Sequence, residues 1–587
     1  MITTHSLSAG SFSELAEGTG DRVVVRELRE AQLSKHMMLL HVVAGAAAGI
    51  DPQTPETDAF SAGYQLLSQV QAADPAVVAR LLGLPHIGSW AHDCLACLDN
   101  GSPPDFGYLA AAAVSAAIQA GLRFEVDVPV RGGRVPLPGL GCLAVPGADE
   151  WVRLSSDGAR LQAGEHIEVA CAALIPDADS VPATPHWEGT PLVRAEADGQ
   201  SWEVLLEIAD RYLDRYALPM LTILPPAEVA NWRQRIQSAW ELLVRQHGWA
   251  AGSIGEGVSV LVPLVPRSDL DSATSPAAFG AIATSLPPSV VSMAETLIHE
   301  FQHNKLSGLM DMLPLIEPSG ERGYAPWRED PRPMAGLLQG VYAFAGIVHF
   351  WDVQRHIKTA PDDVLRANVL YERWRLTIEF VTDTLLGHEV LTPTGVSFVT
   401  ALRERGWRGE SGPVPAEAIE IAREVALDNW LTWQLRHTAL DAAGVAGLAA
   451  AFRRGEPSGR QQLPAAWIDD DTRKIDSMTR SRLLNLRYQE PQRYRELTAE
   501  EIPELAAADV HLIRGDASAA VAAYREGLVA EPDPVAWIGL ALAVHRLPAD
   551  PARPVLTEQL PLLFELHACL AGQGVHADPL DVVAWLA

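Results

Sequence analysis

The segment AETLIHEFQHNKL, residues 294–306, places two histidines four positions apart, with a glutamate directly after the first. Apolar residues continue at helical spacing on both sides, so the segment predicts a helix. On that helix His299 and His303 lie on one face, one turn apart, where both imidazoles can reach a single metal ion. Buried histidines need polar partners, and a shared metal supplies them. The segment therefore predicts a metal-binding helix, with two merely structural histidines as the alternative.

The length of 587 residues exceeds what one hydrophobic core can organise, so several packed units are expected. We expect a helical N-terminal region over 1–121, a β-rich insert over 122–200, a metal-binding catalytic core over 201–400 and a helical C-terminal region over 401–587. The first region contains one long amphipathic helix from about Asp21 to Ile50. Short alternating runs separated by Gly, Pro and Asp mark the insert. The expected fold class is α+β, mostly α.

Two predicted strands, within 257–266 and 278–285, precede the histidine-bearing helix. A strand followed at once by a metal-binding helix is the order found in zincin-like folds, where an edge strand lines the cleft. We therefore expect a zincin-like catalytic core. Further helices are predicted at 334–357 and 362–388. Residues 505–547 resemble one tetratricopeptide-like helix pair, which is alternatively a terminal helical cap.

The charge balance, 45 basic against 74 acidic residues and a net charge of −29, argues against a nucleic acid or an anionic membrane as partner. Phosphates would be repelled rather than neutralised. The five cysteines are too few and too scattered for a disulfide framework, which indicates a reducing cytoplasm. We find no signal-peptide pattern at the N-terminus and no uninterrupted apolar run of the length that predicts a membrane span.

A third metal ligand must come from another element, because two histidines alone do not make a stable site. His349 is the first choice. It lies 46 residues after His303, on the predicted helix 334–357, where a second helix can return to the metal. The alternatives are three carboxylates between the two helices: Glu321, Glu329 and Asp330.

The loop YAPWREDPRPMAG, residues 324–336, joins the two helices and is stiffened by its prolines. Arg328 and Arg332 bracket two acidic residues in it. Arginine binds a carboxylate through two parallel hydrogen bonds, so the loop predicts recognition of a carboxylate on a substrate or cosubstrate. The alternative is an internal Arg–Asp ion pair that fastens the loop. The arginine-rich stretch 453–495 leaves a similar choice between a solvated linker and a docking strip for an acidic peptide.

The segment AETLIHEFQHNKL followed by YAPWREDPRPMAGLLQGVYAF resembles the family of HExxH-motif peptide-modification proteins, which occur in gene clusters for ribosomally made, post-translationally modified peptides. The resemblance is specific between about 278 and 355, looser over the opening HSLSAGSFSELAEGTGD and weakest after about 455. It implies a peptide β-hydroxylase that depends on Fe(II), 2-oxoglutarate and O₂. The residue that it implies as target is aspartate or a similar residue of a ribosomal precursor peptide.

Two chemistries assign different catalytic roles to His299, Glu300 and His303. A zinc peptidase uses Glu300 to deprotonate a metal-bound water. An iron oxygenase needs three protein ligands on one face and no general base. Glu300 would then be a neighbour of the ligands or itself a ligand, and Arg328 or Arg332 would hold the distal carboxylate of 2-oxoglutarate. With His349 as third ligand the site would be all-histidine. A non-catalytic peptide-binding protein with a structural metal is the third alternative.

Overall fold

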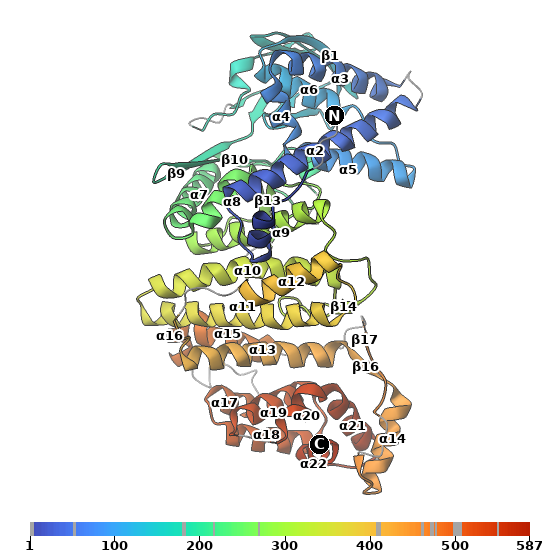
Figure 1. Ribbon diagram of the computed structural model, residues 1–587, viewed down its shortest axis with the longest axis vertical. Coiled ribbons are helices and arrows are strands. Elements are labelled where there is room, and N and C mark those ends of the chain that lie inside the picture. The colour runs from blue at the N-terminus through green and yellow to red at the C-terminus, as the bar shows by residue number, and fades with distance from the viewer. Residues whose placement is uncertain are drawn as a thin grey trace. The chain divides into compact units, whose positions relative to one another are not determined.

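The computed structural model describes residues 5–50, 54–178, 183–214, 218–267, 271–406, 412–458, 463–469, 475, 478–496, 507–548 and 551–587. The chain forms two compact units, Met1–Leu315 and Ile316–Ala587 (Figure 1). Helices hold 61% of the residues and strands 13%, so the predicted α+β, mostly α class is confirmed. The boundary between the units falls inside the predicted catalytic core, between the histidine-bearing helix and the loop that carries Arg328.

The first unit opens on helices arranged around α2 (Arg22–Ala48), the long helix that the sequence predicts. Asp21 caps its N-terminus, because the carboxylate accepts the backbone N–H groups of Val23 at 2.7 Å and Val24 at 3.3 Å. Gly49 ends it. The other helices of this part are α1 (Ala9–Ala16), α3 (Pro55–Ala73), α4 (Pro75–Leu82), α5 (Pro85–Asn100) and α6 (Tyr108–Gln119).

Two four-stranded antiparallel sheets follow, where the sequence predicts a β-rich insert. The first has the order β1 (Arg123–Pro129), β4 (Trp151–Asp157), β5 (Arg160–Ala163) and β6 (Ile167–Ala170). The second has the order β2 (Arg134–Leu137), β3 (Gly141–Ala144), β8 (Trp187–Gly189) and β7 (Ala183–Thr184). In β4 burial alternates along the strand, as expected for a sheet with one face toward a core.

A five-stranded mixed sheet positions the histidine-bearing helix. Its order is β12 (Ser272–Ala273), β13 (Ala281–Thr284), β11 (Val260–Pro263), β10 (Gln200–Leu206) and β9 (Leu192–Ala197). Strands β10, β11 and β13 are parallel, and the two edge strands run antiparallel to them. Strands β11 and β13 are buried at every position and lie where the sequence predicts strands, whereas β12 is too short to show a pattern.

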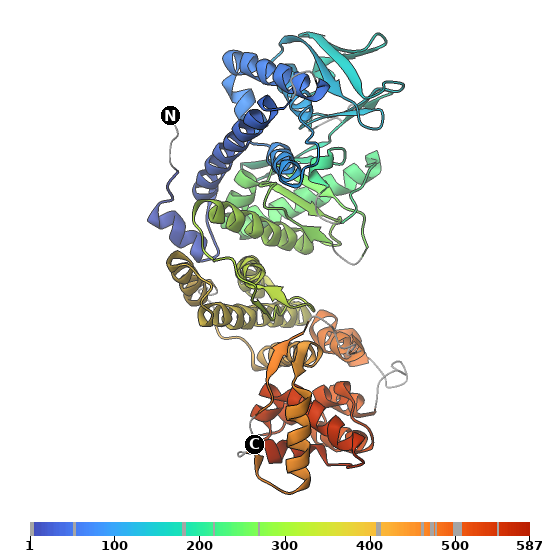
Figure 2. The same cartoon turned by 90° about the vertical axis from the view of Figure 1, so that its right-hand side faces the viewer.

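Three helices pack against this sheet: α7 (Pro226–Gln246), α8 (Gly248–Gly257) and α9 (Val290–Met312). Helix α9 carries both histidines and contacts β12 and β13. Helix α2 runs alongside α8 and α9, as Figure 1 and Figure 2 show. The candidate metal ligands thus lie on a helix held between a sheet and a second long helix.

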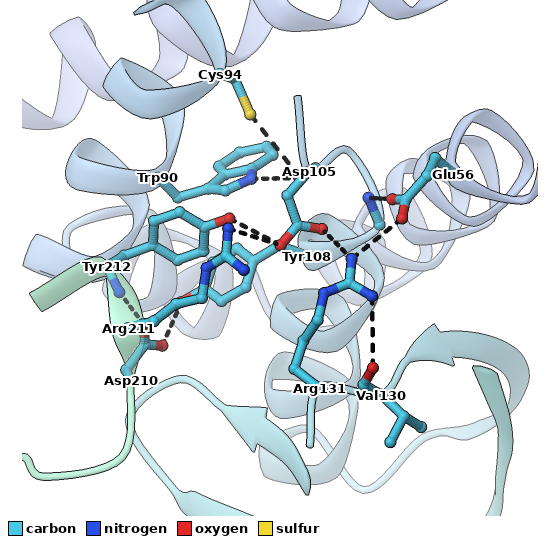
Figure 3. A network of polar contacts seen from close by, with 11 residues as sticks. Glu56, Trp90, Cys94, Asp105, Tyr108, Val130, Arg131, Asp210, Arg211 and Tyr212 are labelled. Carbon is cyan, nitrogen blue, oxygen red and sulfur yellow. Dashed lines mark hydrogen bonds and ion pairs between the residues drawn. The ribbon is translucent and has the colours of Figure 1, made fainter. Parts of the chain in front are cut away.

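A buried polar network joins the N-terminal helices to the segment that precedes α7 (Figure 3). The Asp105 carboxylate accepts hydrogen bonds from Arg131 Nη2 at 3.2 Å and from the Tyr212 hydroxyl at 2.8 Å. The Tyr108 hydroxyl donates to Asp210 at 2.6 Å. Because these buried and partly buried groups satisfy one another, the network ties segments about a hundred positions apart into one core.

The second unit is built mainly of helices. In chain order they are α10 (Met334–Ile357), α11 (Pro361–Gly387), α12 (Pro393–Arg405), α13 (Ala416–His437), α14 (Ala442–Arg453), α15 (Met478–Gln489), α16 (Pro491–Glu496), α17 (Ala507–Ile513), α18 (Ala517–Ala530), α19 (Pro534–Arg546), α20 (Arg553–Glu558), α21 (Leu560–Gly572) and α22 (Pro579–Leu586). Two small two-stranded sheets accompany them: β14 (Arg322–Gly323) with β15 (Arg332–Pro333), and β16 (Thr438–Leu440) with β17 (Ala466–Ile468). Helices α10 and α11 lie where the sequence predicts them.

Helix α10 is, among the described residues, the one helix long and apolar enough to cross a membrane. However, 72% of the most apolar 18-residue stretch of this helix is buried within the protein. A core helix of a soluble protein has the same length and composition, because it must be apolar on all sides.

The helix pair predicted at 505–547 corresponds to α18 and α19, preceded by α17; residues 505–506 lie outside the described residues. Gly539 is needed where the two helices meet, since a Cβ there would come within 2.2 Å of the Tyr524 ring. Parts of the arginine-rich stretch, at 459–462, 470–474 and 476–477, also lie outside the described residues. Within its described part, Arg480 is buried and contacts Asp428 at 3.0 Å.

The first unit also contains a buried histidine–carboxylate pair, His86 and Glu207, with 3.2 Å between Nε2 and Oε2. Burial alone would lower the pKa of His86, but the hydrogen bond to Glu207 and the charges of Asp210 and Glu207 hold this pKa above its usual value. Burial alone would raise the pKa of Glu207, but His86 holds it below its usual value. Each group therefore favours the charged form of the other.

We expect this pair to make the stability of the first unit depend on pH. A raised histidine pKa contributes stability that is fully present below the unfolded pKa of about 6.5 and is lost as pH rises through the folded pKa. The contribution of this pair to the free energy of unfolding should therefore fall between about pH 6 and about pH 8.5. The variant His86→Gln should lack this contribution to the pH dependence of the free energy of unfolding. Urea unfolding of both proteins at the two pH values measures the difference, and equal pH dependences would contradict the assignment.

Candidate metal centre

Helix α9 presents its two histidines on its one partly exposed side. Ser289 caps the helix, because its hydroxyl accepts the Ser292 N–H at 3.0 Å. From position 295 onward, residues 295, 299, 303 and 307 are partly exposed and every residue between them is buried. This spacing is one turn of helix, so the buried remainder packs against the sheet and against α2 and α8. The structure thereby brings His299 and His303 together, with 5.0 Å between ring centroids and 82° between ring planes.

The electrostatic surroundings of this pair suit a metal ligand. Burial and, to a smaller extent, the neighbouring His303 together lower the pKa of His299 to about 3. The His299 imidazole is therefore neutral at physiological pH and keeps a nitrogen lone pair for coordination. Two neutral rings on successive turns can reach one ion, and imidazole nitrogen is a suitable ligand for both iron and zinc. The two residues fit a metal ion of either kind.

The third ligand stays a prediction. Among the described residues, no three His, Cys, Asp or Glu side chains gather as a metal site would require. His349 is partly exposed on α10 and belongs to the second unit, whereas the histidine pair belongs to the first.

The three carboxylates considered as alternative ligands each have a basic partner within the second unit. The Glu321 carboxylate lies 2.5 Å from Nδ1 of His388. The Glu329 carboxylate accepts a hydrogen bond from Arg436 at 2.8 Å. These contacts lie near the surface, where ion pairs contribute little and exchange readily.

Arg328 and Arg332 both contact the third carboxylate, Asp330. Nε of Arg328 donates to Oδ1 at 3.0 Å, and Nη1 of Arg332 donates to Oδ2 at 3.1 Å. Burial alone would raise the pKa of Asp330, but these hydrogen bonds hold it below its usual value. An internal Arg–Asp ion pair is therefore present in the loop. Since a guanidinium has five N–H donors, the same arginines can still bind a second carboxylate, and that role stays a prediction.

Glu300 is buried beneath the edge strand. The Ser272 hydroxyl of β12 donates to its Oε1 at 2.7 Å. Burial raises the pKa of Glu300, while the charge of His303 and hydrogen bonds from Ser272 and Thr274 oppose that rise. The carboxyl thus links the histidine-bearing turn of α9 to β12. The sequence does not indicate that Ser272 contacts Glu300, because a strand of two residues has no recognisable alternation.

Asn304, next to the second histidine, fastens α9 to β13. Its Oδ1 accepts the Gly280 N–H at 2.8 Å, and its Nδ2 donates to the Ala281 carbonyl at 3.3 Å. Gly280 has a φ of +90°, which favours glycine, and a Cβ there would come within 2.9 Å of the Gly257 carbonyl oxygen. The sequence shows that Asn304 follows directly after the second histidine, but only the fold shows that Gly280 and Ala281 are its partners.

The opening segment of the chain packs against the same helix. Gln302 Nε2 donates to the Gly18 carbonyl at 2.7 Å, and Lys305 Nζ donates to the Thr19 carbonyl at 2.7 Å. Lys305 is buried, which lowers its pKa to about 7, and its ammonium lies 5.4 Å from the centroid of the Trp249 ring. The stretch HSLSAGSFSELAEGTGD, where the family resemblance is looser, therefore supports the histidine-bearing helix α9.

Comparison with known proteins identifies no relative: neither a protein-family model nor a curated protein matches the chain.

The substitution Gly257→Ala tests the packing of α8 against α9, and Gly45→Ala on α2 is its control. A Cβ at Gly257, the last residue of α8, would lie 1.9 Å from Phe301 Cζ. Gly257→Ala should therefore lower the free energy of unfolding by about 1–3 kcal/mol, the usual effect of overpacking. Gly45→Ala is the matched control, because that exposed position of α2 has no neighbour within 4 Å; it should stabilise by about 0.5–1 kcal/mol. Denaturant unfolding measures both, and equal effects would contradict the packing described.

Histidine substitutions test the metal site. His299→Ala and His303→Ala should each weaken Co²⁺ or Zn²⁺ binding by more than about 100-fold, because loss of a ligand exceeds the 10–100-fold effect of removing an outer partner. His41→Ala, at an exposed position of α2, is the control and should bind as the wild type does. Isothermal titration of the metal-free proteins measures the affinities. Including His349→Ala decides whether that residue is a ligand.

Proposed function

We propose that the chain is a cytoplasmic Fe(II)- and 2-oxoglutarate-dependent hydroxylase that acts on a ribosomally made precursor peptide. The observation that carries the proposal is the His299–His303 pair, with ring centroids 5.0 Å apart on the one partly exposed side of a buried helix. The family resemblance supplies iron, 2-oxoglutarate and O₂ as reactants, and the β-carbon of aspartate or a similar residue as target. Five free cysteines suit a reducing compartment.

A zincin-like core is part of the proposal. Helix α9 packs against a mixed sheet, and the edge strand β12 runs antiparallel to β13 beside the turn that carries the histidines. The hydrogen bond from Ser272 to Glu300 joins that edge strand to the helix. An edge strand at this place leaves backbone groups that can pair with an extended peptide substrate.

In the proposed reaction His299, His303 and His349 hold iron, and Arg328 or Arg332 binds the distal carboxylate of 2-oxoglutarate. Iron held there would activate O₂, so that one oxygen atom enters a C–H bond of the peptide as C–OH and the other enters the succinate that forms, with CO₂, from 2-oxoglutarate. His299 stays neutral because burial keeps its pKa far below 7, and the neutral imidazole is the form that binds a metal. Glu300 acts as a positioning residue, since its buried carboxyl holds the edge strand against the histidine-bearing turn.

A zinc peptidase is the second candidate, because a HExxH helix beside an antiparallel edge strand suits that chemistry as well. Glu300 would then accept a proton from the metal-bound water. The hydrogen bond from Ser272 involves only Oε1, and Oε2 has no hydrogen-bond partner among the described residues, so the carboxyl suits either chemistry. A non-catalytic peptide-binding protein would use the metal as a support only.

Mass spectrometry of a precursor peptide after reaction with the full chain, Fe(II), 2-oxoglutarate and air tests the proposal. The peptide should gain one oxygen atom, and succinate should form with it. His303→Ala should abolish both, and His41→Ala should change neither. Product formation without O₂ and 2-oxoglutarate, or a hydrolysed peptide, would rule the hydroxylase out.

Glu300→Gln separates the two enzyme candidates. In a hydroxylase the amide can still accept the Ser272 hydrogen bond, so the rate should stay within about tenfold of the wild type. In a peptidase the loss of the general base should cost about 10²–10⁴-fold. The metal content of the variant should be measured alongside, so that loss of metal is not mistaken for loss of a base.

A further inference from the structure

The second unit encloses a cavity of about 360 Å³, lined by the loop 324–329 and by residues of α10, α11, α13 and α15. Five aromatic side chains form much of its surface: Tyr324, Trp327, Phe344, Trp374 and Trp433. Three arginines also line it, against one glutamate, whereas the chain as a whole is strongly acidic. The cavity is thus an aromatic and cationic site in an acidic protein.

The aromatic walls are held rigidly. Phe344 and Trp374 stack with 3.9 Å between ring centroids, and Trp327 lies 5.2 Å from Phe344. The Trp327 ring in turn packs over Gly340 of α10, where a Cβ would come within 2.0 Å of it. Such close packing leaves the rings few alternative rotamers, so the cavity is formed before any ligand binds.

Of the three arginines that line the cavity, Arg373 of α11 has no carboxylate partner among the described residues. Its guanidinium lies 4.8 Å from the Trp374 ring centroid. Nη1 donates to Asn485 Oδ1 at 3.3 Å and to the Tyr488 hydroxyl at 2.9 Å, both neutral groups. No carboxylate of the described residues lies within ion-pair distance of it, whereas the other two arginines of the cavity pair with Asp330 and Glu329. A partly buried cation with neutral partners favours a ligand that brings negative charge.

Three side chains that line the same cavity each have a buried polar atom without a hydrogen-bond partner among the described residues: Tyr324 Oη, Thr432 Oγ1 and Trp433 Nε1. Tyr324 is only 7% exposed and Trp433 only 6%. Burial raises the pKa of Tyr324, so its hydroxyl stays protonated and can donate. The indole N–H can only donate. Buried polar groups are normally satisfied, and these would be satisfied by an acceptor-rich ligand.

We propose that this cavity binds the side-chain carboxylate of an acidic residue of the peptide substrate, with an adjacent apolar or aromatic side chain against the rings. Arg373 supplies the charge, and the Tyr324 hydroxyl and Trp433 indole supply further donors. A free five-carbon dicarboxylate also offers a carboxylate to Arg373 but would leave most of the aromatic wall against water. The peptide part of this inference rests on the proposed function, and the carboxylate part rests on the cavity alone.

Ligand-observed NMR titration of the full, metal-free chain tests the inference without requiring catalysis. The probes are N-acetyl-Asp-Phe-amide, its Asn-Phe counterpart and 2-oxoglutarate. We expect the acidic peptide to bind and its Asn counterpart to bind at least about tenfold more weakly. Arg373→Gln should weaken binding of the acidic peptide at least about tenfold, or about 1.4 kcal/mol. Arg366→Gln, exposed on the same helix, is the matched control and should leave binding unchanged.

Tyr324→Phe provides a second test that keeps the ring and removes only the hydroxyl; it should weaken the acidic peptide several-fold. Tighter binding of 2-oxoglutarate than of the peptide, lost in Arg373→Gln, would overturn the peptide as occupant. No binding of any probe, or equal binding to Arg373→Gln in a folded protein, would overturn the carboxylate site itself. Because iron is absent throughout, a failure to hydroxylate would reject the proposed function and leave this binding result standing.

Discussion

The candidate metal centre depends on how firmly α9 is held, because two imidazoles share an ion only while their helix turns stay in register. The hydrogen bonds of Asn304 to Gly280 and Ala281 provide that constraint, since they fasten the turn that carries the histidines to a fully buried strand. A side-chain amide satisfies both a backbone donor and a backbone acceptor there, so neither is left unpaired in the core. Rigid support of this kind positions ligands better than a loop would.

Helix α9 is also supported by residues near the N-terminus of the chain. Gln302 and Lys305 donate to carbonyls of the opening segment, so residues nearly three hundred positions apart form one layer. The low pKa of Lys305 follows from that burial. An ammonium that is this buried is tolerated because it donates to a backbone carbonyl and lies near an aromatic ring. The opening segment is thus part of the packing that holds the histidine-bearing helix α9.

Arginine chemistry differs along the second unit according to local partners. Arg328 and Arg332 converge on one carboxylate and hold their proline-rich loop. Arg480 is buried and serves as an internal cation for Asp428. Arg373 has only neutral partners and faces a cavity of aromatic rings. The role of an arginine in this unit therefore depends on its partners: it can stabilise a loop, pair with an acid in the core, or line a cavity with neutral partners only.

The sequence by itself determined the elements whose signals are local: the α+β, mostly α class, the long helix that begins near Asp21, the strands β11 and β13, and the helix that sets His299 and His303 on one face. Caps, periodicity and four-residue spacing depend on near neighbours, so they can be seen in the chain itself. Only the tertiary structure decided that Ser272 meets Glu300 and that Arg373 has no carboxylate partner among the described residues. Arg373 and Arg375 look alike in the segment YERWRLT, yet Arg375 pairs with Glu372 at 2.8 Å and Arg373 does not. Such differences depend on which side of a helix meets which distant segment, and that follows from how the whole chain packs.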